Sequence, residues 1–337
     1  MTRDESITLA HGSGGRLMHD LIERVVVRAL ANPVLETLDD AADISSLVEP
    51  GRLAVTTDSF VVQPLFFPGG DIGTLAVAGT VNDLAMKGAR PVALTLGLIA
   101  EEGLPLVDLE RALRSVAETA RAAGVVIAAG DTKVVERGGL GGLILNTAGI
   151  GFVPDGVELG GDRVREGDVM IVSGTMGDHE TAILVAREAF RIDETIESDC
   201  APLHEVARLI LETAPDTRAM RDPTRGGLAT TLNELSSRSG VGIEIDESAV
   251  PVRDDVRSVT DILGFDPLYM ANEGKVVAVV PESDARRVVE ALRGHRLGRD
   301  AAVIGRAAGE PGVTLRTKVG GARPLLMLEG VQLPRIC

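Results

Sequence analysis

Aspartates recur in this chain beside short apolar runs, at positions where strands are expected to end. They are Asp40, Asp58, Asp83, Asp131 and Asp222, in the segments DDAAD, TTDSF, VNDLAM, AAGDTK and RDPTRGG. Carboxylate oxygens are the ligands that Mg²⁺ prefers, and protein-bound Mg²⁺ commonly bridges to phosphates. Ligands of α/β proteins bind outside the carboxyl ends of strands. Each aspartate alone fits a cap or turn residue better, whereas the set of five fits a magnesium–phosphate site equally well.

A glycine-rich loop, HGSGG, occupies residues 11–15. Glycines let a backbone approach a ligand closely, and successive N–H groups can surround phosphate oxygens. The loop lacks the Gly-Lys-Ser/Thr ending of a Walker A sequence, and no strand precedes it as in a dinucleotide-binding unit. A flexible arm is the alternative. Residues 81–89 and 225–231 also place small residues where helices are expected to begin, which suits phosphate binding or close helix–sheet packing.

Two charged residues beside expected strand ends could transfer protons. Lys133 follows Asp131 by two residues, and Glu273 lies in the segment ANEGK. A lysine or glutamate that is partly desolvated in a cleft can reach a pKa suited to acid–base catalysis. Ordinary solvated surface residues are the alternative for both.

Cys337 stands at the end of the sequence, where a role in the hydrophobic core is not expected. A prenylation motif requires the cysteine fourth from the end, so PRIC is not one. A thiolate is a strong nucleophile and a good covalent carrier. Gly330 and Pro334 discourage a regular element in the segment EGVQLPRIC, so we expect residues 329–337 to form a mobile tail. An accidental surface thiol is the alternative, and Cys200 is expected to be structural.

The elements that must position these residues alternate between strand and helix. Apolar periodicity predicts strands at 53–62, 92–100, 125–129, 169–173, 241–245 and 276–280, and a further strand ending near 152. It predicts helices at 107–123, 179–189, 203–211, 226–237 and 283–292, with Gly124 ending the first. The pattern breaks in VPDGVELGG at 153–161, a candidate boundary. We therefore expect an α/β half at 1–155, a second at 156–328 and the tail.

Composition narrows the class of protein. The 337 residues are 45% hydrophobic and 25% charged, which is typical of a globular chain, and the net charge is −16. Nucleic-acid binding needs clustered basic residues or stacking aromatics, so no nucleic-acid partner is expected. The sequence shows no signal-peptide pattern and no apolar run long enough to span a membrane. Two cysteines make no disulfide framework, so a cytoplasmic protein without a membrane partner is predicted.

Seven segments, in order from residue 11 to residue 337, resemble the HypE family of carbamoyl dehydratases, which build the cyanide ligands of [NiFe]-hydrogenase. They are HGSGG, TTDSFVVQPLFFPGGDIG, GTVNDLAMKGARP, AGDTKVV, RDPTRGGLAT, DPLYMANEGK and PRIC. The resemblance implies the two-domain α/β fold of aminoimidazole ribonucleotide synthetase. In that fold the N-terminal half pairs with a second copy into a homodimer around a β-barrel, and the C-terminal half is an α/β sandwich.

The same resemblance implies ATP and Mg²⁺ bound between the glycine loop and the aspartates. It places the metal at Asp40 rather than Asp43, together with Asp58, Asp83 and Asp222. It places ATP contacts at Gly12, Ser13, Gly14, Gly15, Thr57, Asn82, Asp131, Thr132, Arg225 and Gly226.

The mechanism that the resemblance implies uses Cys337 as a tether. A partner carbamoyltransferase loads a carbamoyl group from carbamoyl phosphate onto the thiol, and the tail enters a cleft beside ATP. The carbamoyl oxygen is phosphorylated, a base removes the protons from nitrogen, and phosphate leaves to give a thiocyanate. Lys133 and Glu273 match positions suited to proton transfer. Cyanide then passes to iron on a scaffold complex.

One position departs from the family, because Glu180 in SGTMGDHE stands where a glycine is usual. We expect Glu180 to begin a helix, favoured by the helix dipole. Two alternatives to the family function are open. Another ATP-dependent member of the superfamily, such as a selenophosphate synthetase or a thiamine-phosphate kinase, has no use for a terminal cysteine. A non-catalytic ATP-binding scaffold is disfavoured by the presence of the acidic set, Lys133 and Glu273.

Overall fold

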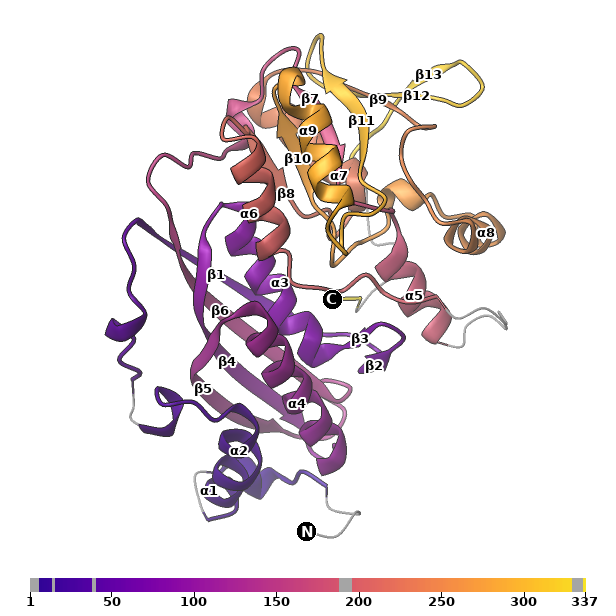
Figure 1. Cartoon of the computed structure of the whole chain (residues 1–337). Helices are drawn as coiled ribbons and strands as arrows, with labels where there is room; N and C mark the ends of the chain where they lie inside the picture. The colour runs from indigo at the N-terminus through magenta and orange to yellow at the C-terminus, as the bar shows by residue number, and fades with distance from the viewer. Residues whose placement is uncertain (1–5, 14–15, 38–40, 188–195, 329–335) are drawn as a thin grey trace.

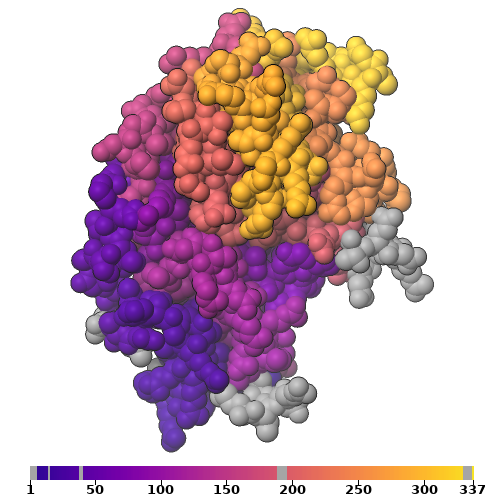
Figure 2. Space-filling view, in the orientation of Figure 1, coloured from indigo at the N-terminus to yellow at the C-terminus, as the bar shows by residue number. Residues whose placement is uncertain are grey.

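The computed structural model describes residues 6–13, 16–37, 41–187, 196–328 and 336–337 (Figure 1). The N-terminal half, indigo to magenta, lies below the C-terminal half, orange to yellow, and the C-terminus lies between them. The space-filling view shows the two halves packed against each other along a broad boundary (Figure 2). No helix in these ranges is long and apolar enough to cross a membrane.

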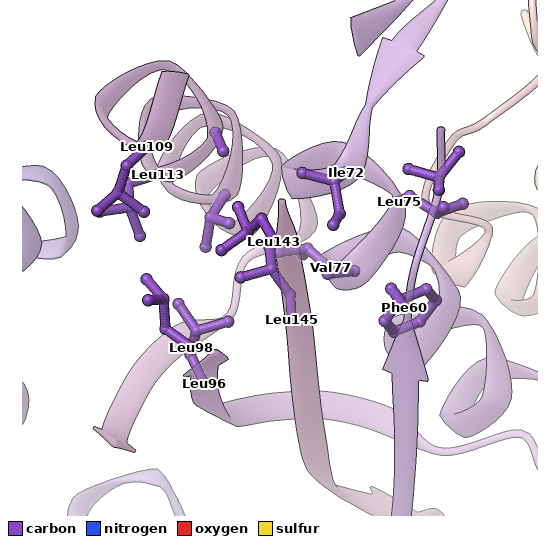
Figure 3. Close-up of a cluster of buried hydrophobic side chains, with 14 of the residues drawn as sticks. Phe60, Ile72, Leu75, Val77, Leu96, Leu98, Leu109, Leu113, Leu143 and Leu145 are labelled. Carbon is purple, nitrogen blue, oxygen red and sulfur yellow. The ribbon is translucent and has the colours of Figure 1, made fainter. Parts of the chain in front are cut away.

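The N-terminal half is a four-stranded sheet with two long helices on one face. The strand order is β1 (Arg52–Phe60), β6 (Leu143–Val153), β4 (Arg90–Glu101) and β5 (Val126–Val135), and only the β4–β5 pair is parallel. Helices α3 (Ile72–Met86) and α4 (Leu106–Ala123) supply the other side of the core (Figure 3). Smaller elements precede and connect them: η1 (Leu9–Gly12), α1 (Arg16–Leu21), η2 (Ile22–Val27), α2 (Arg28–Leu30), η3 (Leu35–Thr37), η4 (Ser45–Leu47), β2 (Phe66–Phe67) and β3 (Gly70–Asp71).

Helix α4 confirms the prediction from periodicity. Leu109, Leu113, Val116 and Ala120 are buried at the expected spacing of one helix face. Gly124 ends the helix with a φ of 68°, in the left-handed region that glycine enters without steric cost.

Helix α3 was missed, and the prediction of a helix start within 81–89 is wrong. The helix begins at Ile72, where the Oδ1 of Asp71 accepts hydrogen bonds from the backbone N–H groups of Gly73 and Thr74, and it ends at Met86. Nearly every residue of α3 is buried, so its sequence is apolar on all sides and shows no helical period.

The second face of the N-terminal sheet is only partly covered. The segment around η4 packs Ile44 and Leu47 over one end of this face. Further along β1, Leu53 is 64% exposed and Val55 is 67% exposed. The described part of the chain therefore forms an open sheet and not a closed barrel.

The C-terminal half sandwiches a seven-stranded sheet between helices. Its strand order is β13 (Ala322–Pro324), β12 (Val313–Arg316), β9 (Ile243–Asp246), β11 (Ala302–Ala307), β7 (Val169–Val172), β10 (Val277–Val280) and β8 (Ala219–Arg221). Helices α6 (His204–Thr213) and α9 (Glu282–Arg293) cover one face, and α7 (Gly227–Ser239) covers the other. Helix α5 (Asp178–Ala186) packs with α8 (Asp254–Leu263) beside the sheet, and the turns η5 (Gly161–Arg163) and η6 (Pro267–Tyr269) complete the half. Strands β8 and β11 to β13 and helix α8 were not predicted.

Candidate active site between the two halves

The first acidic residues of the site lie on β1 and α3. Thr56 Oγ1 donates a hydrogen bond of 2.7 Å to Asp83 Oδ2, which ties the strand to the helix. Asp58 follows Thr56 by two residues and therefore points to the same side of the sheet. Burial raises the pKa of Asp83, and repulsion from Asp58 adds to this effect. Two of the predicted metal ligands are thus neighbours.

Asp222 brings a third carboxylate from the C-terminal half, directly after β8. Burial and repulsion from Asp83 raise the pKa of Asp222 to about 7. Such crowding of carboxylates is unfavourable unless a cation offsets it. No group of three His, Cys, Asp or Glu residues within the described ranges is arranged to hold a metal as it stands. The fourth predicted ligand, Asp40, lies outside the described residues, whereas Asp43 binds the backbone N–H of Ser45 in a turn.

A cavity of about 340 Å³ opens beside these carboxylates. Asp83, Asp222 and Glu234 contribute acidic lining, and Lys87, Arg221 and Arg238 contribute basic lining, with Arg221 paired to Glu234. Its volume is within the range of small-molecule sites. Carboxylates for a divalent cation and basic groups for an anion make this a suitable place for a metal–phosphate ligand.

Glu273 is the most deeply buried acid of the site, only 2% exposed. Burial raises the pKa of Glu273 well above its ordinary value, and repulsion from Asp222 adds to the effect. The backbone N–H of Glu273 donates to Asp199 Oδ1 at 3.0 Å. A carboxyl with a raised pKa, held in place by its backbone, is a candidate for proton transfer.

Both polar groups of the Asn82 side chain are hydrogen-bonded to the backbone around Glu273 and Ala201. Its amide nitrogen donates to the carbonyls of Ala201 and Glu273, and its oxygen accepts from the N–H of Leu203. The contact between Asn82 and ATP stays a prediction, and its buried amide has a structural role because it bonds the backbone on both sides. Asn82 therefore connects α3 to the loop of Glu273.

The C-terminal dipeptide Ile336–Cys337 lies in the same site. Ile336 is buried in the core of the N-terminal half, and Cys337 packs against that core. Burial raises the pKa of Cys337, with a further contribution from Glu273, while Arg225 acts in the opposite direction. A raised pKa disfavours the thiolate, the nucleophilic form of the group. Arg225 Nη2 also lies 4.0 Å from Asp58 Oδ1.

Gly226 and Gly227 shape the turn that leads from Arg225 into α7. Both have left-handed backbones, with φ values of 77° and 60°. A Cβ on Gly227 would lie 2.6 Å from the carbonyl oxygen of Met270. The sequence left phosphate binding and close packing as alternatives for this segment, and Gly227 serves close packing.

Asp131, Thr132 and Lys133 lie on β5, and Thr57 lies on β1 at the opposite edge of the same sheet. Lys133 pairs in register with Ile99, and Asp131 pairs with Gly97, so both lie on the exposed face of the sheet. Thr57 is on that face too, donating to the carbonyl of Thr147, and Thr132 points the other way and is buried. Lys133 faces the open side of the sheet, whereas Glu273 lies with Asp58 on the other side. Lys133 and Glu273 are therefore not brought together within one chain.

The glycine loop lies against the same strand. A Cβ on Gly12 would be 2.7 Å from the backbone nitrogen of Val134, so glycine allows this close approach. Ser13 Oγ donates to the carbonyl of Ala10. Gly14 and Gly15 lie outside the described residues. The described part of the loop therefore lies against β5, the strand that carries Asp131, Thr132 and Lys133.

Sequence reasoning missed the buried residues that hold α5. Lys275 Nζ lies 3.3 Å from Asp178 Oδ2 and 3.2 Å from Asp199 Oδ2, with all three side chains nearly buried. The Oε2 of Glu180 accepts a hydrogen bond of 2.8 Å from the N–H of Ala271. Glu180 is in the first turn of α5, as predicted. The charged segment GDHE before an apolar run was the one sequence signal for these buried residues. It could not identify their partners Ala271 and Lys275, which lie about ninety residues away.

Comparisons with known proteins agree with this architecture. Residues 38–153 match the family described as AIR synthase related protein, N-terminal domain, and residues 165–318 match its C-terminal domain. The carbamoyl dehydratase HypE of Azotobacter vinelandii is 50% identical over 337 residues, covering 99% of this chain and 98% of its own. A crystal structure of the hydrogenase maturation protein HypE in complex with ATP superposes with a TM-score of 0.93 at 48% identity, covering 98% and 99% of the two chains.

A HypE–HypF complex also matches, with a TM-score of 0.79 at 44% identity over 92% of this chain and 99% of that one. Identity near one half along essentially the whole length is joined by the same two-domain fold. The chain therefore belongs to the HypE family of carbamoyl dehydratases.

Proposed function

We propose that this protein is the ATP-dependent carbamoyl dehydratase of [NiFe]-hydrogenase maturation, and that it converts a carbamoyl group on Cys337 to a thiocyanate. The observation that carries the proposal is the position of Cys337, which packs partly buried against the core of the N-terminal half, in the electrostatic field of Glu273 and Arg225. A sulfur held at this position suits a carrier that keeps its carbamoyl group next to the groups that act on it.

Dehydration requires an activated oxygen and a group that accepts protons from nitrogen. The carbamoyl oxygen is a poor leaving group until the terminal phosphoryl group of ATP is transferred to it. Loss of the two nitrogen protons and of phosphate then leaves a C≡N bond on sulfur. We assign proton acceptance to Glu273, and stabilisation of the negative charge on the carbamoyl oxygen to the guanidinium of Arg225.

Asp58, Asp83 and Asp222 would hold Mg²⁺, with Asp40 added on the family resemblance. Their mutual repulsion fits a cation, which would supply charge neutralisation for the ATP phosphates. ATP would contact the cavity beside them. Contacts of ATP with the glycine loop and β5 would have to come from a second copy of the chain, because within one chain Asp131 and Lys133 face the other side of the sheet.

A homodimer would complete the N-terminal half. Leu53 and Val55 leave apolar surface on the open face of the sheet, and Asp131 and Lys133 lie on that same face. A second copy packed there would close a barrel and move Lys133 from solvent into the interface. Proton transfer by Lys133 would then depend on the dimer.

The proposed partners are a carbamoyltransferase, which loads Cys337, and an iron-carrying scaffold complex, which takes the cyanide. The solved assembly of a related HypE with HypF supports the first of these. We place the reaction in the cytoplasm.

Intact-protein mass spectrometry tests the proposal. Incubation with the carbamoyltransferase and carbamoyl phosphate, together with ATP, should add the mass of a carbamoyl group and then remove the mass of water. Cys337→Ala should show neither change, and Cys200→Ala should behave like the wild type because Cys200 is buried away from solvent. Equal modification of Cys337→Ala would refute the carrier role. Stable carbamoylation without loss of water in the presence of ATP would instead favour a non-catalytic scaffold.

A further inference from the structure

The first turn of α5 contains three consecutive buried residues that bind three different parts of the chain. Asp178 pairs with Lys275, and Glu180 binds the backbone of Ala271 through both its carboxylate and its N–H. His179 lies between them and is fully buried. Because Asp178 and Glu180 are both held in place, the backbone of His179 is held between them, and with it the direction in which the imidazole leaves the helix.

Both ring nitrogens of His179 are engaged. Nδ1 lies 2.8 Å from Ser198 Oγ, and Nε2 lies 2.7 Å from the carbonyl oxygen of Ile336. A carbonyl can only accept, so Nε2 carries the hydrogen. Ser198 Oγ accepts from the N–H of Cys200, which leaves its own hydrogen for Nδ1. The two partners therefore select one tautomer of a neutral imidazole.

We propose that His179, oriented by Ser198, is the positioning residue that anchors the C-terminal dipeptide in the cleft and so presents the group on Cys337 to Glu273. The bonded carbonyl belongs to the peptide unit that joins Ile336 to Cys337, so this hydrogen bond fixes the backbone immediately before the thiol. The ring of His179 meets Phe67 edge-on at 5.6 Å, which leaves it little freedom to rotate.

The same helical turn also positions the loop of the base. Glu180 holds Ala271, two residues before Glu273, while His179 holds Ile336, one residue before Cys337. Neighbouring residues of one helix thus hold the backbone before the carrier Cys337 and the backbone before the base Glu273. The part of this inference that concerns dehydration rests on the proposed function, whereas the anchoring of the dipeptide does not.

Alkylation of Cys337 by N-ethylmaleimide, followed by intact-protein mass spectrometry, measures how often the dipeptide leaves the cleft. Cys200 is buried and burial raises its pKa well above the ordinary value, so it contributes no signal. His179→Phe should raise the alkylation rate about tenfold, the effect of losing one buried hydrogen bond. His179→Gln keeps an N–H that can reach Ile336 and should stay near the wild-type rate. His204→Phe, a matched change on α6, should have no effect.

An unchanged rate in folded His179→Phe would overturn the anchor. If that variant does not fold, Ser198→Ala provides the test, since it removes the donor to Nδ1 and should also speed alkylation; a wild-type rate there would equally overturn the proposal. In the full reaction, His179→Phe should load a carbamoyl group normally and lose water at least about tenfold more slowly. Failure of the wild type to become carbamoylated would refute the proposed function, and the alkylation result would still decide the anchor.

Discussion

The Nζ of Lys275 lies 3.2 Å from the Oδ2 of Asp199, and the same nitrogen reaches Asp178 at 3.3 Å. The buried ammonium thus joins α5 to the segment that carries Asp199, whose other oxygen holds the backbone of Glu273. Burial and the two carboxylates act on the pKa of Lys275 in opposite directions, and the carboxylates prevail, so that its pKa is raised.

Lys275→Met should be strongly destabilising, because it leaves two buried carboxylates without their cation. We expect the free energy of unfolding to fall by about 3 to 5 kcal/mol, measured by urea denaturation at pH 7.5. Arg286→Met removes the exposed pair with Glu290 on α9 and should cost less than about 1 kcal/mol. Similar losses in both variants would show that burial does not distinguish the two ion pairs.

Gly227→Ala should destabilise the turn before α7 by at least about 2 kcal/mol, from backbone strain and from the clash with Met270. Gly240 provides the matched control at the other end of α7. It has a φ of 72° but open space around its missing Cβ, so Gly240→Ala should cost only the backbone strain, about 1 kcal/mol. Thermal unfolding of both variants measures the difference, and equal losses would mean that contact with Met270 is unimportant.

Asp83→Asn should weaken magnesium-dependent ATP binding at least about tenfold, or about 1.4 kcal/mol. The amide can still accept the hydrogen bond from Thr56, so the helix stays tied to β1 and only the charge is lost. Isothermal titration with and without Mg²⁺ measures the effect. Asp216→Asn, on the exposed surface, is the control. Retention of full magnesium-dependent affinity in Asp83→Asn would remove this residue from the metal site.

Glu273→Gln should allow carbamoyl loading of Cys337 but slow the loss of water by about 10²- to 10⁴-fold, the usual contribution of a general base. Quenched samples weighed as intact protein separate the two steps. Loss of water at the wild-type rate would assign the proton acceptor elsewhere.

His179 should make stability depend on pH. Burial lowers its pKa in the folded protein, so below about pH 6.5 the unfolded chain takes up a proton that the folded chain excludes. This contribution to stability is complete above pH 6.5 and is lost as the pH falls toward the lowered folded value. The difference in free energy of unfolding between wild type and His179→Gln should therefore shrink between pH 7.5 and 5.5. Parallel pH curves for the two proteins would contradict this.

The sequence alone determined which residues could do chemistry and much of the framework that carries them. Periodicity located α4, because this helix buries one face against a sheet, and short apolar runs located central strands such as β7 and β10, which are buried on both faces. It failed for α3, which is buried on all sides and so has no polar face to reveal its period. The motifs also identified the chain's family from short segments spread along its length.

Only the tertiary structure decided how those residues are grouped. Strand alternation placed Asp58 with Asp83, Asp222 and Glu273, but sent Lys133 and Asp131 to the opposite face of the same sheet. The tertiary structure also brings His179 to Ile336, a hydrogen bond between residues 157 positions apart. Local sequence encodes the conformation of an element and its apolar face, whereas pairing between distant polar groups depends on how the two halves pack, which no short segment specifies.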